Sequence, residues 1–300
     1  MSMDINIPGV ALVFEGGGMR ASYTAGFAVM LLENDLNFPK VYGISAGASH
    51  TVNYLSRDAA RTKASFVDLV NDPQFGGWGS FLRGEGYFSA HHLYEGIICE
   101  RRYPDEPMGF DFATFAANPA DCHIEAFDWE TGETVAWTKA DMPTPFDAGV
   151  RVRASSTMPI FMPPTPVAGR TFMDGGMGSS WGICLDAALA DGFSRVVVVR
   201  TQERAYRKTE TAPAARAAFR ALFRRHPLVA ENTINRWSHY NQLLDRIDAL
   251  EAEGRAFVFA PERMDITNRE TDFATLQATY ERGYAQANRE YERLTRWLQG

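Results

Sequence analysis

The fold is decided by residues 10–20, which read VALVFEGGGMR. Residues 10–14 form a short continuous apolar run, which is typical of a strand buried inside a parallel sheet. From Tyr23 to Leu31, apolar side chains recur at spacings of three and four, which predicts a helix. The glycines between strand and helix leave backbone N–H groups unhindered at a helix N-terminus, where they can stabilise negative charge. This order of elements indicates an α/β fold.

Residues 41–55 repeat the plan around a second turn. A short strand ends at Gly43, a sharp turn holds Ser45, and a helix begins at Ala46. The resulting G-x-S-x-G pattern, closed by Gly47, predicts a nucleophile elbow, in which a strained turn exposes the serine hydroxyl. Glycine at both flanks lets strand and helix approach closely. A plain tight turn also uses small residues, but the strand before and the helix after favour a catalytic Ser45.

A serine nucleophile needs a base at neutral pH. Behind Asp174 the only histidines are His226, at a helix boundary, and His239, inside a long predicted helix, and we expect neither to act as the base. Asp174 follows a predicted strand and precedes Gly175 and Gly176, so it can be brought up to Ser45 as the second member of a dyad. The alternative is an ordinary D-G turn.

Two cofactor interpretations compete with this one. Residues 16–21 also fit the dinucleotide fingerprint G-x-G-x-x-A, which makes a nucleotide-binding enzyme the second interpretation. That fingerprint expects an acidic residue at the end of the second strand, where the turn of Ser45 stands instead. The pair His91-His92 has no further ligand at a spacing typical of metal sites. We therefore predict no cofactor and no metal.

Composition narrows the class of protein. The chain has 300 residues, of which 45% are hydrophobic, and a formal net charge of -7, which argues against nucleic acid as a partner. We find no signal peptide, no apolar run long enough to span a bilayer and only three scattered cysteines, so we expect a cytoplasmic protein. We predict a single domain over residues 1–300, with a motif core at 8–200 and a helical part at 201–300.

Four motifs in this order resemble the patatin-like phospholipase family. They are EGGGMR at 15–20, the elbow at 43–47, an Ala/Ser-rich stretch ending in prolines at 154–164, and DGG at 174–176. The resemblance covers residues 8–200. It implies a three-layer α/β fold with a mostly parallel central sheet wrapped by helices. It also implies a serine hydrolase of the phospholipase, lysophospholipase or esterase type, which cleaves lipid acyl esters through a Ser-Asp dyad and an acyl-enzyme.

The resemblance implies a role for each matching residue. Ser45 is the nucleophile and Asp174 is the base. The oxyanion is held by consecutive N–H groups of the glycine loop, those of Gly16, Gly17, Gly18 and Met19. Supporting positions are Arg20, which braces the glycine loop, and the turn glycines Gly43, Gly47, Gly175 and Gly176.

The sequence departs from the family at two positions. Glu15 stands where the family often has aspartate, and Ala21 stands where a further glycine is common. Neither change removes an N–H group from the expected oxyanion hole, so they concern the geometry of the loop more than its chemistry.

Residues 200–225 carry eight basic side chains against two acidic ones, opposite to the balance of the whole chain. A solvated face is the common outcome for such a stretch. The alternative is an amphipathic basic helix that makes transient, peripheral contact with anionic membranes. We predict a lipid or fatty-acyl ester as substrate, and a catalytically silent lipid-binding protein as the non-enzymatic alternative.

The aromatic and glycine-rich residues 61–120 predict short helices and loops, with a cap over the active site as one interpretation.

Overall fold

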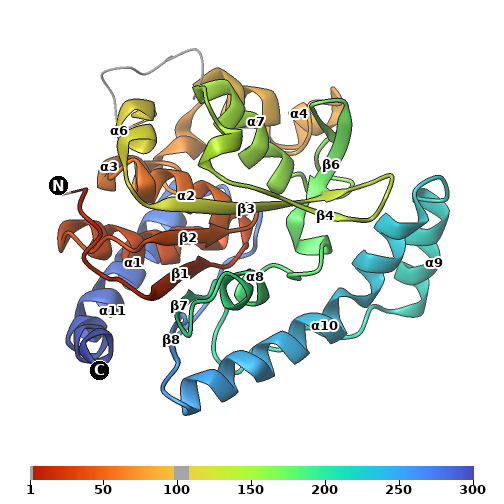
Figure 1. Ribbon diagram of the computed structural model, residues 1–300. Coiled ribbons are helices and arrows are strands. Elements are labelled where there is room, and N and C mark those ends of the chain that lie inside the picture. Colours follow the sequence, from red (N-terminus) through yellow and green to blue (C-terminus); the bar gives the residue numbers. More distant parts are fainter. Residues whose placement is uncertain (1–2, 98–107) are drawn as a thin grey trace.

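The computed structural model describes residues 3–97 and 108–300. An eight-stranded sheet lies at its centre, with helices on both faces (Figure 1). The strands are β1 (Val10–Phe14), β2 (Lys40–Gly43), β3 (Asp121–Asp128), β4 (Thr134–Trp137), β5 (Thr165–Val167), β6 (Arg170–Asp174), β7 (Arg195–Val199) and β8 (Ala256–Phe259).

The strand order is β5-β6-β3-β2-β1-β7-β8, and β4 pairs with β3 outside this path. β3, β2, β1, β7 and β8 are parallel to one another. The antiparallel pairs are β3 with β4, β3 with β6, and β5 with β6. The predicted α/β fold with a mostly parallel central sheet is confirmed.

Alternate residues of the central strands pack on opposite faces of the sheet, as the period of a strand requires. Leu12 and Val197 contribute to one apolar cluster, whereas Val13 and Val198 contribute to another. The longer helices that contribute side chains to the first cluster are α1 (Ala21–Glu33), α2 (Ala46–Leu55), α7 (Pro145–Ser155) and α11 (Phe273–Gln299). The long helix that contributes to the second cluster is α10 (Pro227–Ala252). The continuous apolar runs therefore mark strands buried on both sides.

Shorter elements connect these layers. The α-helices are α3 (Ala59–Ala64), α4 (Trp78–Leu82), α6 (Phe112–Ala117), α8 (Leu185–Ala190) and α9 (Pro213–Leu222). The single turns are η1 (Gly18–Arg20), η2 (Asp68–Asn71), η4 (Lys139–Asp141) and η5 (Gly175–Met177), and η3 (His91–Gly96) is a π-helix. The expectation of short helices within residues 61–120 holds for the described part, while 98–107, with Cys99, lie outside it.

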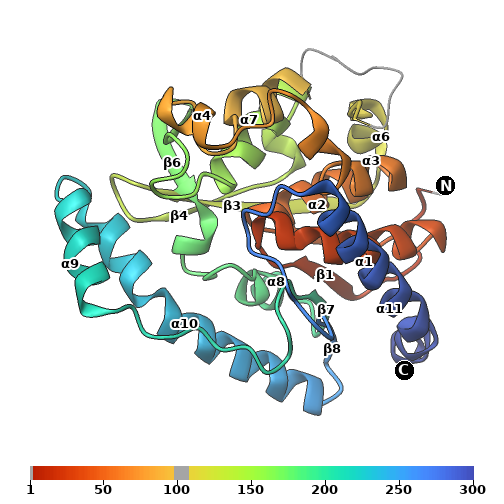
Figure 2. The same cartoon turned by 180° about the vertical axis from the view of Figure 1, so that it is seen from behind.

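The C-terminal helix α11 lies along α1 (Figure 2). Two glycines allow this close approach: a Cβ on Gly26 would lie 2.2 Å from the Tyr284 nitrogen, and one on Gly283 would lie 2.0 Å from the Tyr23 oxygen. β8, also from the C-terminal part, extends the same sheet beside β7. The single domain over residues 1–300 stays our prediction, and these contacts support it. Within the described residues, no helix combines the length and the apolar character needed to cross a membrane.

One feature of the sheet positions the candidate site: β2 and β6 meet end to end along the same edge of β3. β2 pairs with residues 121–124 of β3, and β6 pairs with residues 126–128. β4 pairs with residues 124–127 and overlaps both, so it occupies the other edge. The chain leaves β2 at Gly43 and leaves β6 at Asp174, and these two ends face each other.

Candidate active site

Ser45 sits in a strained turn at the start of α2. Its φ is 57° and its ψ is -125°, a conformation that side chains rarely adopt. Its N–H donates to the Ser155 hydroxyl at 2.9 Å. A Cβ on Gly43 would lie 2.2 Å from the Gly47 oxygen, and one on Gly47 would lie 2.3 Å from the Phe14 oxygen. The turn therefore requires both glycines, and it holds the serine as a nucleophile elbow does.

Asp174 ends β6 and lines the same polar pocket as Ser45. Its N–H donates to the Thr157 carbonyl at 2.8 Å, and its Oδ1 accepts from the Gly176 N–H at 2.7 Å. The Ser45 side chain is one of the neighbours that favour the ionised form of Asp174, and both residues line the polar pocket described below. Burial raises the pKa of this carboxyl, although the charge of Arg236 acts in the opposite direction. The carboxyl group is thus buried in the pocket that Ser45 also lines.

The two glycines after Asp174 are constrained by the same contacts. A Cβ on Gly175 would lie 2.2 Å from the Glu125 oxygen, and one on Gly176 would lie 2.5 Å from a guanidinium nitrogen of Arg236. The D-G-G turn therefore packs directly on β3 and on α10.

The glycine loop lies beside Ser45, but two of its four expected donors are already engaged. The Gly16 N–H donates to the Gly182 carbonyl, and the Met19 N–H donates to the Asn268 carbonyl, both at 3.1 Å. For the N–H groups of Gly17 and Gly18, we find no acceptor among residues 3–97 and 108–300. In this conformation the loop therefore offers an oxyanion two donors, those of Gly17 and Gly18.

Glu15 fixes the start of this loop. Its buried carboxylate accepts from the Thr201 N–H at 2.7 Å and from the Tyr240 hydroxyl at 2.5 Å. Glutamate is longer than the aspartate of the family pattern, and here it connects the loop to the end of β7 and to α10. The departure from the pattern thus has a structural use.

The bracing role expected for Arg20 stays a prediction. Its side chain makes no hydrogen bond to another described residue, and it lines a polar pocket that also contains Ser45 and Asp174. Burial lowers the pKa of its guanidinium. The cation therefore faces the candidate site rather than the loop backbone.

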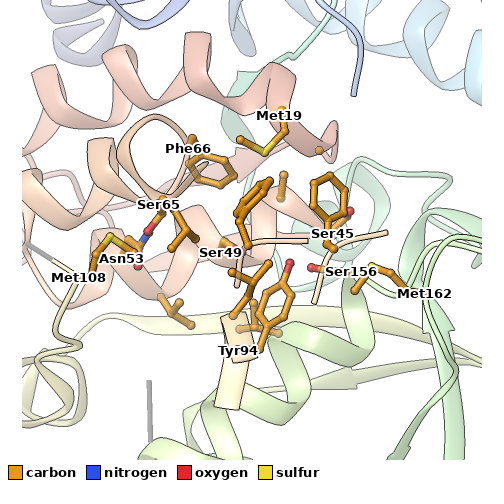
Figure 3. Close-up of a pocket in the computed structure, with 18 of the residues that line it drawn as sticks. Met19, Ser45, Ser49, Asn53, Ser65, Phe66, Tyr94, Met108, Ser156 and Met162 are labelled. Atoms are coloured by element: carbon orange, nitrogen blue, oxygen red, sulfur yellow. The ribbon is translucent and has the colours of Figure 1, made fainter. Parts of the chain in front are cut away.

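Two pockets meet at Ser45. The apolar pocket is lined by methionine, phenylalanine and leucine side chains, including Met19, Phe66, Leu69, Phe75, Phe88 and Met162 (Figure 3). The polar pocket is lined by charged and amide side chains, namely Glu15, Arg20, Asp174, Lys208, Arg236 and Asn268. Gly18, Ser45 and Met158 line both pockets. The serine hydroxyl thus lies where an apolar chain and a polar group of one molecule could meet.

Part of the wall of the apolar pocket comes from the described residues of 61–120, the segment interpreted as a cap. Phe66, Leu69, Leu93 and Tyr94 belong to it. Burial raises the pKa of Tyr94, so its hydroxyl stays protonated. The segment covers the pocket, while a role as a moving lid remains an interpretation.

The histidines lie away from Ser45. His226 stacks on Trp129 with ring centroids 3.9 Å apart, and His239 stacks on Trp181 at 4.2 Å. His50 is a buried residue of α2, its Nε2 is 2.9 Å from the Thr24 hydroxyl, and burial lowers its pKa to about 3. Neither His226 nor His239 lines a pocket with Ser45, whereas Asp174 does.

One group of side chains within the described residues could hold a metal ion. His123, Glu125 and Cys184 have potential ligand atoms within 4.8 Å of one another. His123 lies 2.8 Å from Glu125, and Ser180 donates to the same carboxylate at 3.0 Å. Burial raises the pKa of the Cys184 thiol, which disfavours the thiolate that a metal requires. The expectation of a metal-free reaction stays a prediction.

Three residues of the polar pocket were not anticipated from the sequence. Lys208, Arg236 and Asn268 all follow residue 200, beyond the four motifs. Arg236 stands on a long amphipathic helix, where an arginine is normally assigned to solvent, so no local signal distinguishes it.

Comparison with known proteins gives two family matches. The patatin-like phospholipase family matches residues 12–189, and a domain of unknown function, DUF6363, matches residues 226–299. No curated protein matches significantly. Among solved structures, VipD from Legionella pneumophila has a similar fold, with a TM-score of 0.51 and 14% identity over 97% of this chain and 66% of VipD. At that identity the likeness shows the fold alone.

The match to the patatin-like phospholipases covers more than half of the chain, and it includes both the turn of Ser45 and the turn of Asp174. The two residues that the sheet brings together are thus the ones that the family's motifs contain, and the chain belongs to the patatin-like phospholipases.

Proposed function

We propose that this protein hydrolyses carboxylic esters of lipids with Ser45 as nucleophile and Asp174 as base. The observation that carries the proposal is that Ser45 and Asp174 line one polar pocket, and that Ser45 lies where this pocket joins the apolar one. The family supports lipid hydrolysis in general. The dyad, the oxyanion donors and the ester specificity are our inference from the geometry.

The first half of the reaction forms an acyl-enzyme. The Ser45 oxygen attacks the ester carbonyl carbon while Asp174 takes the hydroxyl proton. The carbonyl oxygen becomes an oxyanion, which accepts hydrogen bonds from the N–H groups of Gly17 and Gly18. When the tetrahedral intermediate collapses, the bond to the leaving alcohol breaks and Asp174 returns the proton to that oxygen.

The second half releases the fatty acid. Water attacks the acyl carbon and gives a proton to Asp174, so a second tetrahedral intermediate forms at the same oxyanion donors. Its collapse breaks the bond to Ser45, whose oxygen recovers the proton from Asp174. The apolar pocket binds the acyl chain throughout, because methionine and phenylalanine side chains line it.

The proposal is tested with a fluorophosphonate probe and with p-nitrophenyl esters of short and long acyl chains. We expect the native protein to be labelled and to turn over ester. Ser45→Ala loses both, and Asp174→Asn loses turnover. The double variant His226→Ala/His239→Ala keeps both, because neither ring lies near Ser45. A native protein that binds lipid vesicles but neither labels nor turns over would instead be a silent lipid-binding protein.

We further propose that membrane contact is confined to one end of the 200–225 stretch. Arg200 is fully buried, and Lys208 lies in the polar pocket. Four of the others form ion pairs with carboxylates: Arg204 with Glu251, Arg207 with Asp245 and Asp248, Arg216 with Glu210, and Arg220 with Glu231.

Arg224 and Arg225 make no ion pair with any described residue, and they follow Leu222, whose exposure is 59%. Together with Phe81 and the exposed Ile160, these residues line an open hollow between α4 and the end of α9. Exposed apolar side chains beside free cations fit an anionic bilayer surface. The double variant Arg224→Glu/Arg225→Glu should bind phosphatidylglycerol vesicles more weakly than the native protein. The control Arg216→Glu should bind them as the native protein does. Equal binding by the native protein, the double variant and the control would reject the contact.

A further inference from the structure

Three cations line the polar pocket in which Ser45 and Asp174 meet. They are Arg20 from the glycine loop, Lys208 from the segment before α9, and Arg236 from α10. All three are partly buried, and none lies within ion-pair distance of a carboxylate of the described chain. Cations held in this way at a pocket wall are costly to desolvate unless an anion occupies the pocket.

The two carboxylates of the pocket do not neutralise these cations directly. The oxygens of Glu15 accept from the Thr201 N–H and the Tyr240 hydroxyl, and Oδ1 of Asp174 accepts from the Gly176 N–H. When all five groups are ionised, positive charge therefore exceeds negative charge in the pocket by one.

The cations are also held in place by their surroundings. Lys208 exchanges hydrogen bonds with Asn241 through its backbone, at 2.8 and 3.0 Å, and its ammonium lies 4.4 Å from the centre of the Tyr240 ring. Gly176 and Gly182 make room for Arg236: a Cβ on either would lie within 2.9 Å of its guanidinium. The pocket is thus shaped around these groups.

The three cations affect one another's pKa values. Burial and the neighbouring charges of Arg236 and Arg20 lower the pKa of Lys208 to about 7, with burial as the main cause. A bound anion would relieve that repulsion and restore the ammonium charge.

We propose that Arg20, Lys208 and Arg236 bind the phosphate of the substrate's head group, so that the enzyme selects glycerophospholipids over neutral acyl esters. The inference rests on the proposed hydrolysis. In a glycerophospholipid the phosphate is only a few bonds from the scissile ester, so with the ester carbon at Ser45 it lies in the same pocket. Guanidinium and ammonium groups are the preferred protein partners of phosphate oxygens.

The residues that would provide this selectivity lie mostly outside the part of the chain that matches the patatin-like phospholipases. Lys208 follows residue 189, where that match ends, and Arg236 lies in the DUF6363 match. Asn268 of the same match accepts the Met19 N–H and so shapes the glycine loop. The C-terminal part thus supplies side chains to the site itself.

A purely electrostatic role for the cations is the competing explanation, because Arg236 and Lys208 also favour the ionised form of Asp174. The two explanations differ in what they do to substrate preference. Support of Asp174 affects every ester equally, whereas a phosphate site affects only substrates that carry the phosphate.

The experiment compares dihexanoyl phosphatidylcholine with neutral dihexanoylglycerol, below the micellar concentration. We expect Lys208→Gln and Arg236→Gln each to lower the ratio of kcat/KM for the phospholipid to that for the neutral ester by about 10- to 100-fold, mainly through KM. Arg236→Lys keeps part of the preference. Arg246→Gln, an exposed control on α10 paired with Asp186, keeps the native ratio. An unchanged ratio in both glutamine variants overturns the proposal.

Two further measurements separate the remaining outcomes. The first is the melting temperature of the native protein with inorganic phosphate. If phosphate raises the melting temperature but the enzyme shows no preference for the phospholipid over the neutral ester, the site binds free phosphate, and the head-group assignment is overturned. Binding of the short phospholipid to Ser45→Ala is followed by calorimetry. One outcome separates the two proposals: the phospholipid binds only when Lys208 and Arg236 are present, and the native protein cleaves neither ester. This outcome would reject the hydrolysis and support the phosphate site.

Discussion

The hydroxyl of Ser155 joins the catalytic turn to the central sheet: it accepts the Ser45 N–H at 2.9 Å and donates to the Glu125 carbonyl at 2.6 Å. Ser155 ends α7, and Glu125 lies in the middle of β3. All three groups are buried, so water does not replace either bond. This hydroxyl therefore helps to hold the strained backbone of Ser45 in place.

Replacing Ser155 with alanine should lower both the stability of the protein and its rate of ester turnover. The change leaves a buried N–H and a buried carbonyl without this partner, which costs about 1–3 kcal/mol in the free energy of unfolding. We expect kcat to fall with little change in KM, because the nucleophile loses orientation while the pockets remain. Urea unfolding and steady-state kinetics measure the two effects, and a variant with native stability and native kcat would contradict them.

The pH dependence of activity should reflect the raised pKa of Asp174. Only the ionised carboxylate can take the proton of Ser45, so activity is lost as pH falls through the pKa of the folded protein. Because burial raises that pKa, the acidic limb of kcat/KM should lie above the ordinary aspartate range. A pH profile with a neutral ester measures this limb, and a limb at or below the ordinary range would contradict the burial effect.

The same shift predicts how stability depends on pH. A carboxyl whose pKa is raised by folding holds its proton more tightly in the folded state. Its contribution to stability is present below the unfolded pKa and is lost as pH rises through the folded pKa. Asp174→Asn removes this loss, so the variant should gain stability relative to the native protein as pH rises through that window. Thermal unfolding across pH provides the comparison, and a parallel pH dependence in both proteins would contradict it.

The backbone of Ser45 predicts a difference between two inactive variants. Glycine adopts a φ of 57° with a ψ of -125° readily, whereas alanine retains the strain. The free energy of unfolding of Ser45→Gly should therefore exceed that of Ser45→Ala by about 1 kcal/mol. In urea unfolding, the glycine variant should have the higher midpoint concentration. Neither should react with a fluorophosphonate. Equal stability of the two variants would show that the turn relaxes without strain.

Substitutions in the glycine loop should reduce the rate strongly. A Cβ on Gly17 would lie 2.5 Å from the Thr201 hydroxyl, and one on Gly18 would lie 2.3 Å from the Asn268 oxygen. Displacing one oxyanion donor costs about 10²–10³ in kcat. We expect such a loss in Gly17→Ala and Gly18→Ala. Gly192→Ala is the control, since Gly192 also has a positive φ but open space around it; a similar loss there would point to general destabilisation.

Much of the fold was predictable because the deciding signals are local. The apolar runs at β1 and β7 identified strands buried on both faces, and the small residues around Ser45 identified the sharp turn before α2. Each of these features depends on neighbours within a few residues. The order of strands, and hence the meeting of β2 with β6, depends on pairings between distant segments that no local pattern records.

The electrostatics of the site were less predictable for the same reason. The basic stretch at 200–225 has a clear composition, but its meaning depends on partners elsewhere in the fold. Arg204 and Arg207 form ion pairs with carboxylates on α10. Lys208, their neighbour in sequence, instead lines the same pocket as Asp174. Arg20 follows the glycines as the family motif requires, yet the direction of its side chain is set by surrounding segments.

The carbonyl of Asn268 holds the Met19 N–H beside the oxyanion loop, and Asp174 reaches Ser45 only through the pairing of β6 with β3. A ribosome-bound chain that has emerged only as far as the family motifs would therefore carry the reactive residues without a completed site. The chain must be synthesised and folded at least as far as residue 268 before the site is complete. A nascent chain shorter than this would lack the proposed activity.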